Sequence, residues 1–430
     1  MVLFKKNWLR ETVKKIMLMI RIKKPFDVRA DQINWGKCKK TIKTLTVFVP
    51  FDFSTGNFGG GLRVLNEYKA LSKHFRIFAI AVPGIRKSPF KINDNFTVIP
   101  IPTNRNFWEL LKEEEKKAGG HLNDVLFTDH YDLVPGLKDI FLKLFNITDI
   151  FISSHPYFFK MFKNYGGDKS LMYEAHNVDA ELKKTYLNSN NIYAKKYLDT
   201  VEEVESIACN ESAIVSAVSE QDKNGLSKRY GIEPDKVVVV PNGVDCSSCE
   251  FIPYSERLRR SKERSIVFVS SAHGPNIEAV DFIINFLAPA DKKNNYLIIG
   301  NVDIEYVGKN IPDNVKFLGI LNNSEKNKVL ADASVAINPM FSGGGTNLKV
   351  LEYLACGLPL ISTKYGMRGF EQLMNYAFIA DDDNFLNVIT EVMSMRVDKL
   401  DENSLKARGI VKNNFDWTVV TRELINRLIV

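Results

Sequence analysis

The sequence is poor in cysteine, with five in 430 residues. This odd, sparse count excludes a small disulfide-stabilised secreted scaffold and favours a reduced intracellular compartment. Cys246-x-x-Cys249 lacks a second cysteine pair and nearby histidines, so no zinc site is expected there.

Short-period repeats and low-complexity tracts are also missing, and a hydrophobic content of 45% excludes wholesale disorder. The chain is long enough for two domains.

Long hydrophobic runs are missing from the N-terminal segment. Its longest apolar run covers residues 16–20, whereas about 20 residues are needed to span a bilayer. The run is also too short for a secretory signal. The spacing of Leu9, Val13, Ile16 and Ile20 instead predicts an amphipathic helix over residues 3–22.

Excess positive charge is missing from most of the chain. Residues 1–43 carry a net charge of +10, which leaves −3 for the other 387 residues. The body therefore lacks the basic composition of a nucleic-acid-binding protein. The basic helix favours an anionic membrane surface as the partner of residues 1–24, with the rest of the segment as a tether. This predicts a cytoplasmic protein, peripheral on the inner face of the plasma membrane. The alternative is a helix that packs on its own domain or on another protein.

From residue 44 onward, short apolar runs alternate with amphipathic segments of helical length, a pattern typical of α/β folds with parallel sheets. Two series of strands are expected, separated by a polar linker over residues 246–264. The predicted architecture is two doubly wound domains that face each other, over residues 44–250 and 265–415. A C-terminal helix over 416–430 could pack back on the N-terminal domain. The expected strands are residues 45–49, 75–81, 149–153, 171–174, 213–218, 237–240, 266–270, 296–299, 315–318, 335–338, 358–362 and 378–380.

The most informative motif is Ser342-Gly-Gly-Gly-Thr-Asn-Leu-Lys-Val-Leu-Glu352, which follows a predicted strand and begins a helix. Gly343, Gly344 and Gly345 let backbone N–H groups approach an anion, and the helix N-terminus adds its partial positive charge. Lys349 is suited to neutralise phosphate, and Glu352 to accept the two hydroxyls of a ribose. The motif thus predicts a diphosphate–ribose site that needs no metal.

The run from Asn338 to Gly369 resembles the nucleotide-sugar signature of GT-B glycosyltransferases, specifically the retaining glycosyltransferase family 4 group. Similar stretches occur elsewhere in the same order, so the resemblance covers residues 44–430. They are Gly59-Gly-Gly-Leu-Arg63, Tyr173-Glu-Ala-His-Asn177, Ser216-Ala-Val-Ser219 and Val239-Val-Pro-Asn-Gly-Val-Asp245.

The resemblance implies a nucleotide-diphosphate sugar bound mostly to the second domain, with the acceptor in the first. Glu352 takes the place of the family's ribose-binding acid, and the helix start at Thr346, Asn347 and Leu348 supports the diphosphate. Gly60 and Gly61 close over it from the other domain. His176 takes the place of a histidine that contacts the donor sugar, and His155 is a weaker candidate on the acceptor side.

Two positions depart from the family pattern. The first acid of its Glu-x7-Glu motif falls at Gly344, so backbone groups or other residues must recognise the donor sugar. A basic pair that holds the diphosphate in many members is missing from residues 269–278. His273 and Asn276 could donate hydrogen bonds there, and Lys349 or Arg63 could supply the charge.

The sequence therefore predicts a glycosyltransferase with His176, Glu352 and Lys349 as catalytic residues. It would move a sugar, with retention of configuration, to a glycan or lipid-linked glycan in surface polysaccharide assembly. No prosthetic group and no metal are expected. The alternatives are a sugar-nucleotide epimerase of the same fold and a catalytically silent binding subunit. A nicotinamide-dependent oxidoreductase is disfavoured, because residues 59–61 lack the Gly-x-Gly-x-x-Gly spacing.

Overall fold

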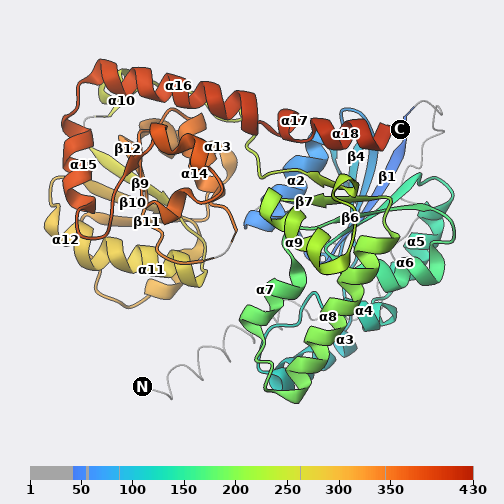
Figure 1. Cartoon of the computed structure of the whole chain (residues 1–430). Coiled ribbons are helices and arrows are strands. Elements are labelled where there is room, and N and C mark those ends of the chain that lie inside the picture. The colour runs from blue at the N-terminus through green and yellow to red at the C-terminus, as the bar shows by residue number, and fades with distance from the viewer. Residues whose placement is uncertain (1–41, 55–57, 87, 262, 344, 430) are drawn as a thin grey trace.

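The structure is a computed structural model, and it describes residues 42–429 apart from 55–57, 87, 262 and 344. The helix predicted over residues 3–22 lies outside this range, and so does nearly all of its tether. Figure 1 shows two α/β bodies side by side, joined along one edge by a row of helices. We call them the N-terminal domain, built on strands β1–β8, and the C-terminal domain, built on β9–β14.

The N-terminal domain is built on a sheet in which the described strands follow the order β3-β4-β2-β1-β5-β6-β7-β8. All neighbours pair in parallel except the edge strand β3, which runs antiparallel to β4. The strands are β1 (Thr44–Val49), β2 (Arg76–Ala81), β3 (Phe90–Asn93), β4 (Phe96–Pro100), β5 (Ile150–Ser154), β6 (Ser170–Glu174), β7 (Ile214–Ala217) and β8 (Val237–Val239).

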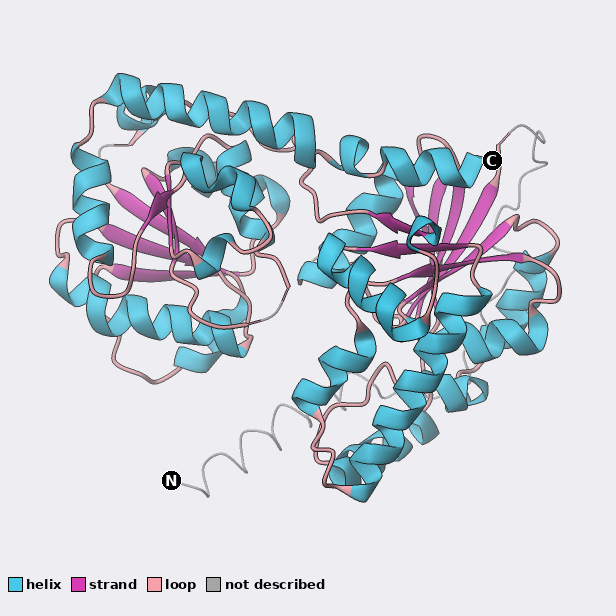
Figure 2. Ribbon diagram, in the orientation of Figure 1, coloured by secondary structure: helices cyan, strands magenta, loops and turns pink. Residues whose placement is uncertain are grey.

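Helices cover both faces of this sheet, as Figure 2 shows. Strands buried on both faces read as continuous apolar runs, and β1, with six buried residues, is such a strand. The helices of this domain are α2 (Gly59–Leu71), α3 (Arg105–Ala118), α4 (Phe127–His130), α5 (Leu137–Phe145), α6 (Phe159–Tyr165), α7 (Asp179–Tyr186), α8 (Ile192–Glu211) and α9 (Glu220–Tyr230).

The C-terminal domain contains a second parallel sheet, whose described strands follow the order β11-β10-β9-β12-β13-β14. The strands are β9 (Ser265–Val269), β10 (Asn295–Ile299), β11 (Val315–Gly319), β12 (Val335–Asn338), β13 (Leu360–Ser362) and β14 (Phe378–Ile379). The helices are α10 (Tyr254–Arg260), α11 (Gly274–Phe282), α12 (Ala288–Ala290), α13 (Asn323–Asp332), α14 (Leu348–Ala355), α15 (Phe385–Ser394) and α16 (Val397–Phe415).

Both sheets agree with the predicted doubly wound α/β class, with two differences in detail. The antiparallel hairpin of β3 and β4 at the sheet edge was not predicted. The polar linker predicted over residues 246–264 joins the two sheets but packs on the C-terminal domain. Cys246 and Cys249 are buried in the C-terminal core, and the buried Arg257 of α10 donates hydrogen bonds to the carbonyls of Ile252 and Ala333.

Within residues 42–429 the described chain crosses between the domains twice, and the two crossings are bonded to each other. In the first, Val244 N–H donates to the carbonyl of Phe415, and in the second, Trp417 N–H donates to the carbonyl of Val244. Gly243 is packed so closely that a Cβ there would lie 2.8 Å from the Phe415 oxygen. We call residues 242–245 the hinge segment.

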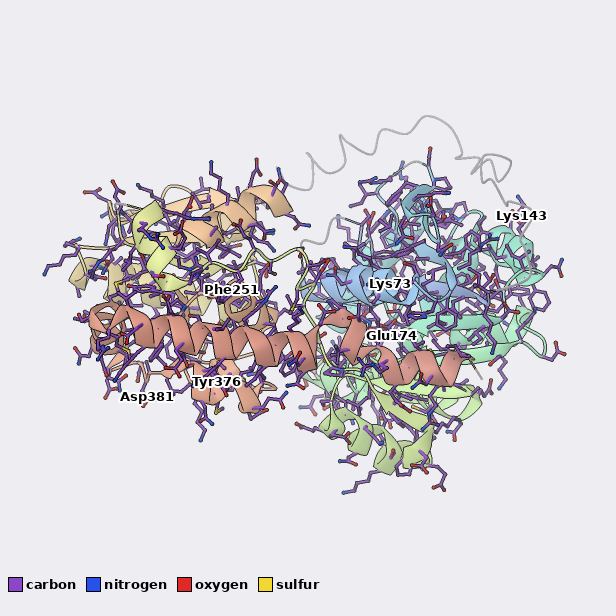
Figure 3. The ribbon with its side chains drawn as sticks, turned by 90° about the horizontal axis from the view of Figure 1, so that it is seen from above. Lys73, Lys143, Glu174, Phe251, Tyr376 and Asp381 are labelled. Atoms are coloured by element: carbon purple, nitrogen blue, oxygen red, sulfur yellow. The ribbon has the colours of Figure 1, made fainter. Side chains whose placement is uncertain are left out.

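The second crossing returns the chain to the N-terminal domain. Helix α16 is followed by α17 (Trp417–Val420) and α18 (Arg422–Ile429). The sequence predicted a single helix over residues 416–430, where the structure has the two short helices α17 and α18. Figure 3 shows these helices running across both domains, with Tyr376 and Asp381 labelled in the C-terminal domain and Glu174 in the N-terminal domain. Leu424, Ile425 and Leu428 of α18 join the apolar core that β1, β2 and α2 form.

The described residues contain no helix with both the length and the apolar character needed to cross a bilayer. They also contain no group of three histidine, cysteine or acidic side chains arranged to hold a metal ion.

Candidate active site

A glycine turn joins β12 to α14 and rests on the start of α11. Gly343 has a φ of +110°, and a Cβ there would lie 2.9 Å from Pro275 Cγ, so this position requires glycine. Gly345 also has a positive φ, of +64°, but open space surrounds its Cα. Gly344 lies outside the described residues. The contact with Pro275 places the turn that precedes α14 against the N-terminus of α11, and the first N–H groups of a helix have no partner within it.

Lys349, in the first turn of α14, lies between these two helix starts. Its Nζ donates to Asn276 Oδ1 at 3.0 Å and lies 4.0 Å from the centre of the Phe268 ring. Asn276 in turn donates through Nδ2 to Ser271 Oγ. Burial lowers the pKa of Lys349 to about 7. Among the described residues no carboxylate forms an ion pair with this lysine, so its charge is available to an anion.

Glu352 lies three residues further along α14. Its carboxylate forms an ion pair with Lys326 of α13, and its side chain is 19% exposed. The lysine and the acid that the sequence places on one helix therefore have different neighbours, since Lys349 bonds to α11 and Glu352 to α13. The acid stays reachable from solvent.

Tyr365 and Arg368, which follow β13, hold the glycine turn through its carbonyl groups. The Tyr365 hydroxyl donates to the carbonyl of Gly343, and Arg368 Nε donates to the carbonyl of Gly345 at 2.7 Å. The Arg368 guanidinium also stacks 4.3 Å from the centre of the Tyr365 ring. Asn347 is fixed as well, because its Nδ2 donates to the carbonyl of Gly366. The turn is thus fastened by its carbonyls and leaves N–H groups at the helix start to bind an anion.

The start of α2 in the N-terminal domain meets the start of α14. A Cβ at Gly59 would lie 3.7 Å from Leu348 Cδ1, an ordinary contact distance. Gly60 and Gly61 follow and pack against the ring of Phe58, which a Cβ at Gly61 would approach to 3.1 Å. Residues of both domains therefore border the glycine turn.

His176 lies in the N-terminal domain just beyond β6. Its Nε2 is 3.0 Å from Ser154 Oγ and 3.2 Å from Glu174 Oε1. Burial lowers the pKa of His176 to about 4, although the Glu174 carboxylate opposes this shift, so the imidazole is neutral at neutral pH. Its ring centre is 4.5 Å from that of His155.

His155 follows β5 and has a φ of +69°, which side-chain-bearing residues rarely adopt. Its Nδ1 lies 3.1 Å from Asp179 Oδ2. Burial by itself would lower the pKa of His155, but the Asp179 carboxylate outweighs it and raises that pKa. The structure thus brings the two candidate histidines together and gives them opposite pKa shifts.

Arg63 and His273 are placed differently from the other candidates. Arg63 is 2% exposed, with Nη2 at 2.9 Å from Glu67 and Nε at 3.7 Å from Glu174. Its charge faces these acids, so we do not assign it to the diphosphate. His273 is exposed at the start of α11, where its carbonyl accepts from Asn276 N–H and its side chain makes no cap.

Comparison with known families identifies this arrangement. Residues 129–248 match the model of Glycosyltransferase Family 4, and residues 263–395 match that of Glycosyl transferases group 1. The chain is a glycosyltransferase of these families. Comparison with curated protein sequences found no match.

Solved structures with the same architecture include three glycosyltransferase-fold proteins, each 13% identical to this chain. Sucrose-phosphate synthase from Thermosynechococcus elongatus aligns with a TM-score of 0.65 over 90% of this chain and 99% of its own. Anabaena Alr3699/HepE, in complex with UDP-glucose, aligns at 0.59 over the same shares. WaaG, a glycosyltransferase involved in lipopolysaccharide biosynthesis, aligns at 0.58 over 89% and 99%. These likenesses show that the glycosyltransferase has the GT-B fold.

Several residues around the candidate site were missed from the sequence. Tyr365 and Arg368, which follow β13, contact the turn, and Lys326 of α13 contacts α14; nothing in their spacing marks them. Asn242 of the hinge segment donates to Thr346 Oγ1 at 2.8 Å. Its Pro-Asn-Gly-Val-Asp motif was a signal that could have found it.

Glu205 of α8 is fully buried, whereas its neighbour Glu203 on the same helix is exposed. Glu205 accepts from the N–H groups of Asp179 and Ala180 at the start of α7. Burial and the Asp179 charge raise the pKa of Glu205 to about 7. This acid thus stabilises the helix that supports His155.

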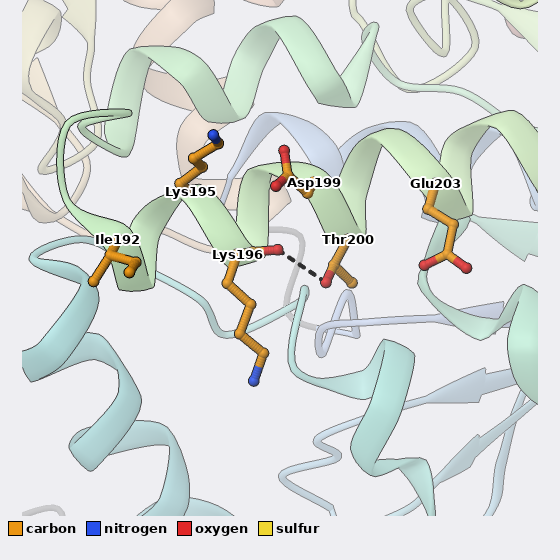
Figure 4. Close-up of a pocket in the computed structure, with 6 residues that line it drawn as sticks. All are labelled: Ile192, Lys195, Lys196, Asp199, Thr200 and Glu203. Carbon is orange, nitrogen blue, oxygen red and sulfur yellow. Dashed lines mark hydrogen bonds between the residues drawn. The ribbon is translucent and has the colours of Figure 1, made fainter.

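A surface hollow of about 400 Å³ lies elsewhere in the glycosyltransferase, along α8 of the N-terminal domain (Figure 4). One helix supplies the whole lining, and Thr200 Oγ1 donates to the Lys196 carbonyl within it. None of the candidate site residues borders the hollow, so we assign no chemistry to it. The lining residues are Ile192, Lys195, Lys196, Asp199, Thr200 and Glu203.

Proposed function

We propose that this glycosyltransferase moves a sugar from a nucleotide-diphosphate sugar to a glycan or lipid-linked glycan acceptor, with retention at the anomeric carbon. The observation that carries the proposal is Lys349, a lysine without an acidic partner among the described residues, set between the starts of α11 and α14. Helix N-termini and an unpaired cation favour a polyanion such as a diphosphate.

The donor would extend along α14 from the glycine turn. Its diphosphate would accept hydrogen bonds from N–H groups at residues 345–348 and from Lys349, while Glu352 would accept the ribose hydroxyls. UDP-glucose in the Anabaena structure supports a nucleotide sugar as donor. No prosthetic group or metal enters this scheme.

The chemistry would be driven by charge stabilisation. As the glycosidic bond to the diphosphate breaks, negative charge grows on the leaving oxygen, and the helix starts and Lys349 stabilise it without reorganisation. The acceptor hydroxyl would attack from the same face of the sugar and pass its proton to the departing phosphate. Contact between α2 and α14 would exclude water from the reaction.

His176 would position the donor sugar. Its neutral imidazole, bonded between Ser154 and Glu174, suits hydrogen bonding to a sugar hydroxyl. His155, whose ring lies next to it, would contact sugar or acceptor from the same side. Both histidines belong to the N-terminal domain, where we place the acceptor.

The acceptor would belong to surface polysaccharide assembly. The basic composition of residues 1–24 favours an anionic membrane, where lipid-linked glycans are built. The similarity of fold to WaaG, which is involved in lipopolysaccharide biosynthesis, supports the same class of acceptor. The enzyme would then work as a peripheral protein on the cytoplasmic face.

Replacing Glu352 by alanine tests the proposal. The variant should bind UDP, ADP, GDP or CDP, whichever the wild type prefers, about tenfold more weakly, because hydrogen bonds to a charged carboxylate are lost. Lys326→Ala is the matched control, since it breaks the Lys326–Glu352 ion pair and keeps the acid. Binding is measured by calorimetry, and thermal unfolding reports whether each variant is folded.

Equal affinity of Glu352→Ala and the wild type would contradict the ribose assignment. Product analysis covers the remaining alternatives. Conversion of the nucleotide sugar without acceptor would indicate an epimerase, whereas donor binding without any turnover would indicate a silent subunit.

A further inference from the structure

A hydrogen-bonded chain of three side chains connects the N-terminal domain to the glycine turn. Arg63 of α2 donates through Nη1 to Asn242 Oδ1 at 3.2 Å, and Asn242 donates through Nδ2 to Thr346 Oγ1 at 2.8 Å. Thr346 lies two residues before α14 begins. The chain therefore ends where the proposed donor diphosphate would bind, and the inference below rests on that proposed function.

The direction of every bond in this chain is fixed by Arg63. A guanidinium only donates hydrogen bonds, so the oxygen of the Asn242 amide must face it. The amide NH₂ must then face Thr346, whose oxygen accepts. A hydroxyl has one proton, and among the described residues no acceptor takes the proton of Thr346. That proton is left for a ligand.

Arg63 is well fixed as the origin of the chain. It is 2% exposed and lies between Glu67 and Glu174. Burial raises the pKa of Glu67 to about 8, whereas His176 and Arg63 overcome burial and hold the pKa of Glu174 at about 2. Glu174 is thus the ionised partner, and the same carboxylate contacts His176.

Thr346 is also fixed in rotation. A Cβ at Gly369 would lie 2.3 Å from Thr346 Cγ2, so the methyl group sits directly against this glycine. Threonine side chains are stiff about χ1 because both heavy atoms branch at Cβ. With its methyl on Gly369 and its oxygen on Asn242, the hydroxyl has one orientation available.

We infer that Arg63 and Asn242 are positioning residues, which orient the Thr346 hydroxyl as a hydrogen-bond donor to the diphosphate of the donor. Asn242 lies in the hinge segment and Arg63 in the N-terminal domain, so the diphosphate site in the C-terminal domain depends on both domains. Domain placement and donor binding are thereby linked through one amide.

Asn242→Asp tests the direction of the chain. Aspartate keeps the size and accepts from Arg63, but it cannot donate to Thr346 and would take the Thr346 proton instead. We expect about tenfold weaker binding of the nucleoside diphosphate that the wild type prefers among UDP, ADP, GDP and CDP, as for one lost bond to a charged group. Thr346→Val should give the same loss, and Thr346→Ser should bind within about threefold of the wild type, since it keeps the hydroxyl.

Two controls separate positioning from folding. Asp245→Asn makes the reverse change three residues along the hinge segment and breaks the exposed Lys69–Asp245 ion pair. The affinity of this variant for the nucleoside diphosphate should therefore stay within twofold of the wild type. The double variant Asn242→Asp with Thr346→Val should bind no more than about twofold worse than either single variant, because both remove the same bond. The corresponding nucleoside, followed by saturation-transfer NMR, should bind all variants alike.

The possible results distinguish a failure of the proposed function from a failure of the positioning role. If the wild type binds none of the four nucleoside diphosphates, the proposed function is wrong. If it binds one of them, and Asn242→Asp or Thr346→Val binds it equally well, the positioning role is wrong and the donor site stands. Additive losses in the double variant, or equal loss of nucleoside binding, would also overturn the positioning role.

Discussion

Burial changes the protonation of three side chains around the site. Lys349 has a pKa of about 7, His176 of about 4 and Glu67 of about 8. At neutral pH the lysine is thus half charged, the histidine neutral and the glutamic acid protonated. An arriving diphosphate would meet a lysine that gains charge as it binds, because an anion stabilises the ammonium form.

Donor affinity should therefore depend on pH through Lys349. The protonated form binds better, so the dissociation constant should rise by up to tenfold per pH unit above 7, until the pKa of the bound state is reached. Calorimetry with the preferred nucleotide sugar between pH 6 and 9 measures this. Binding at pH 8 should also take up a proton, which buffers of different ionisation enthalpy reveal.

The Lys349→Met variant should bind the preferred nucleotide sugar weakly, and its affinity should not depend on pH in this way. Lys364→Met removes an exposed lysine beyond β13 and should keep the wild-type profile. A wild-type affinity that stays constant from pH 6 to 9 would show that Lys349 does not contact the donor.

The sequence supplied the candidate site residues more readily than the contacts that hold them in place. Lys349, Asn276 and Glu352 could be named because glycine turns and helix starts bind anions through residue types that a motif displays. The pairing of Lys349 with Asn276 could not be predicted, since it depends on how α11 and α14 pack. The surroundings of Arg63 were only partly predictable, because Glu67 lies on the same helix but Glu174 comes from a distant strand.

At the scale of elements, the glycine turn works as a spacer between two helix starts. Gly343 allows the turn to lie against Pro275 of α11, while Tyr365 and Arg368 fasten it from beyond β13. Lys349 of α14 can thereby reach Asn276 at the start of α11. A displaced turn would weaken the proposed anion site and leave the sheets intact.

Gly343→Ala should test this spacing. Its φ of +110° strains an L-residue, and the new Cβ would also meet Pro275 at 2.9 Å. Gly345→Ala is the matched control, because it brings a positive φ into open space. We expect a loss of about 1–2 kcal/mol in unfolding free energy for Gly345→Ala and a larger loss for Gly343→Ala.

Donor affinity should fall further in Gly343→Ala than in Gly345→Ala, as calorimetry would show. If the two variants match in both thermal unfolding and affinity, the contact with Pro275 has no influence on the site.

Most elements could be predicted, because strands buried on both faces form apolar runs. The hairpin of β3 and β4 was missed since β3 is an edge strand in which Lys91 and Asn93 are exposed. The intervening Asn93-Asp94-Asn95 was an available turn signal. The polar composition of residues 246–264 indicated a linker. Composition does not reveal that a charged residue of this stretch, Arg257, is buried among backbone carbonyls.

At the scale of the whole molecule, positive charge is concentrated in the basic segment, residues 1–43. The body beyond residue 43 has a net charge of −3, so it offers little attraction to anionic lipid by itself. Residues 1–24 would provide that attraction, and salt would screen it.

The full chain should therefore sediment with vesicles rich in anionic lipid, and a chain lacking residues 1–24 should stay in the supernatant. Vesicles of neutral phosphatidylcholine and a series of salt concentrations serve as controls, since both should reduce binding of the full chain. Equal sedimentation of the two chains would argue against an anchor in this segment.

The return of α18 to the first sheet has a consequence for synthesis. Leu424, Ile425 and Leu428 cover apolar residues of β1 and β2, but the ribosome makes them only after the entire second sheet. Until then, the first sheet has an uncovered apolar face, which chaperones or neighbouring nascent chains could bind. A fragment that stops at the hinge segment would keep this defect permanently, and it should recover solubility when residues 416–429 are supplied as a separate peptide.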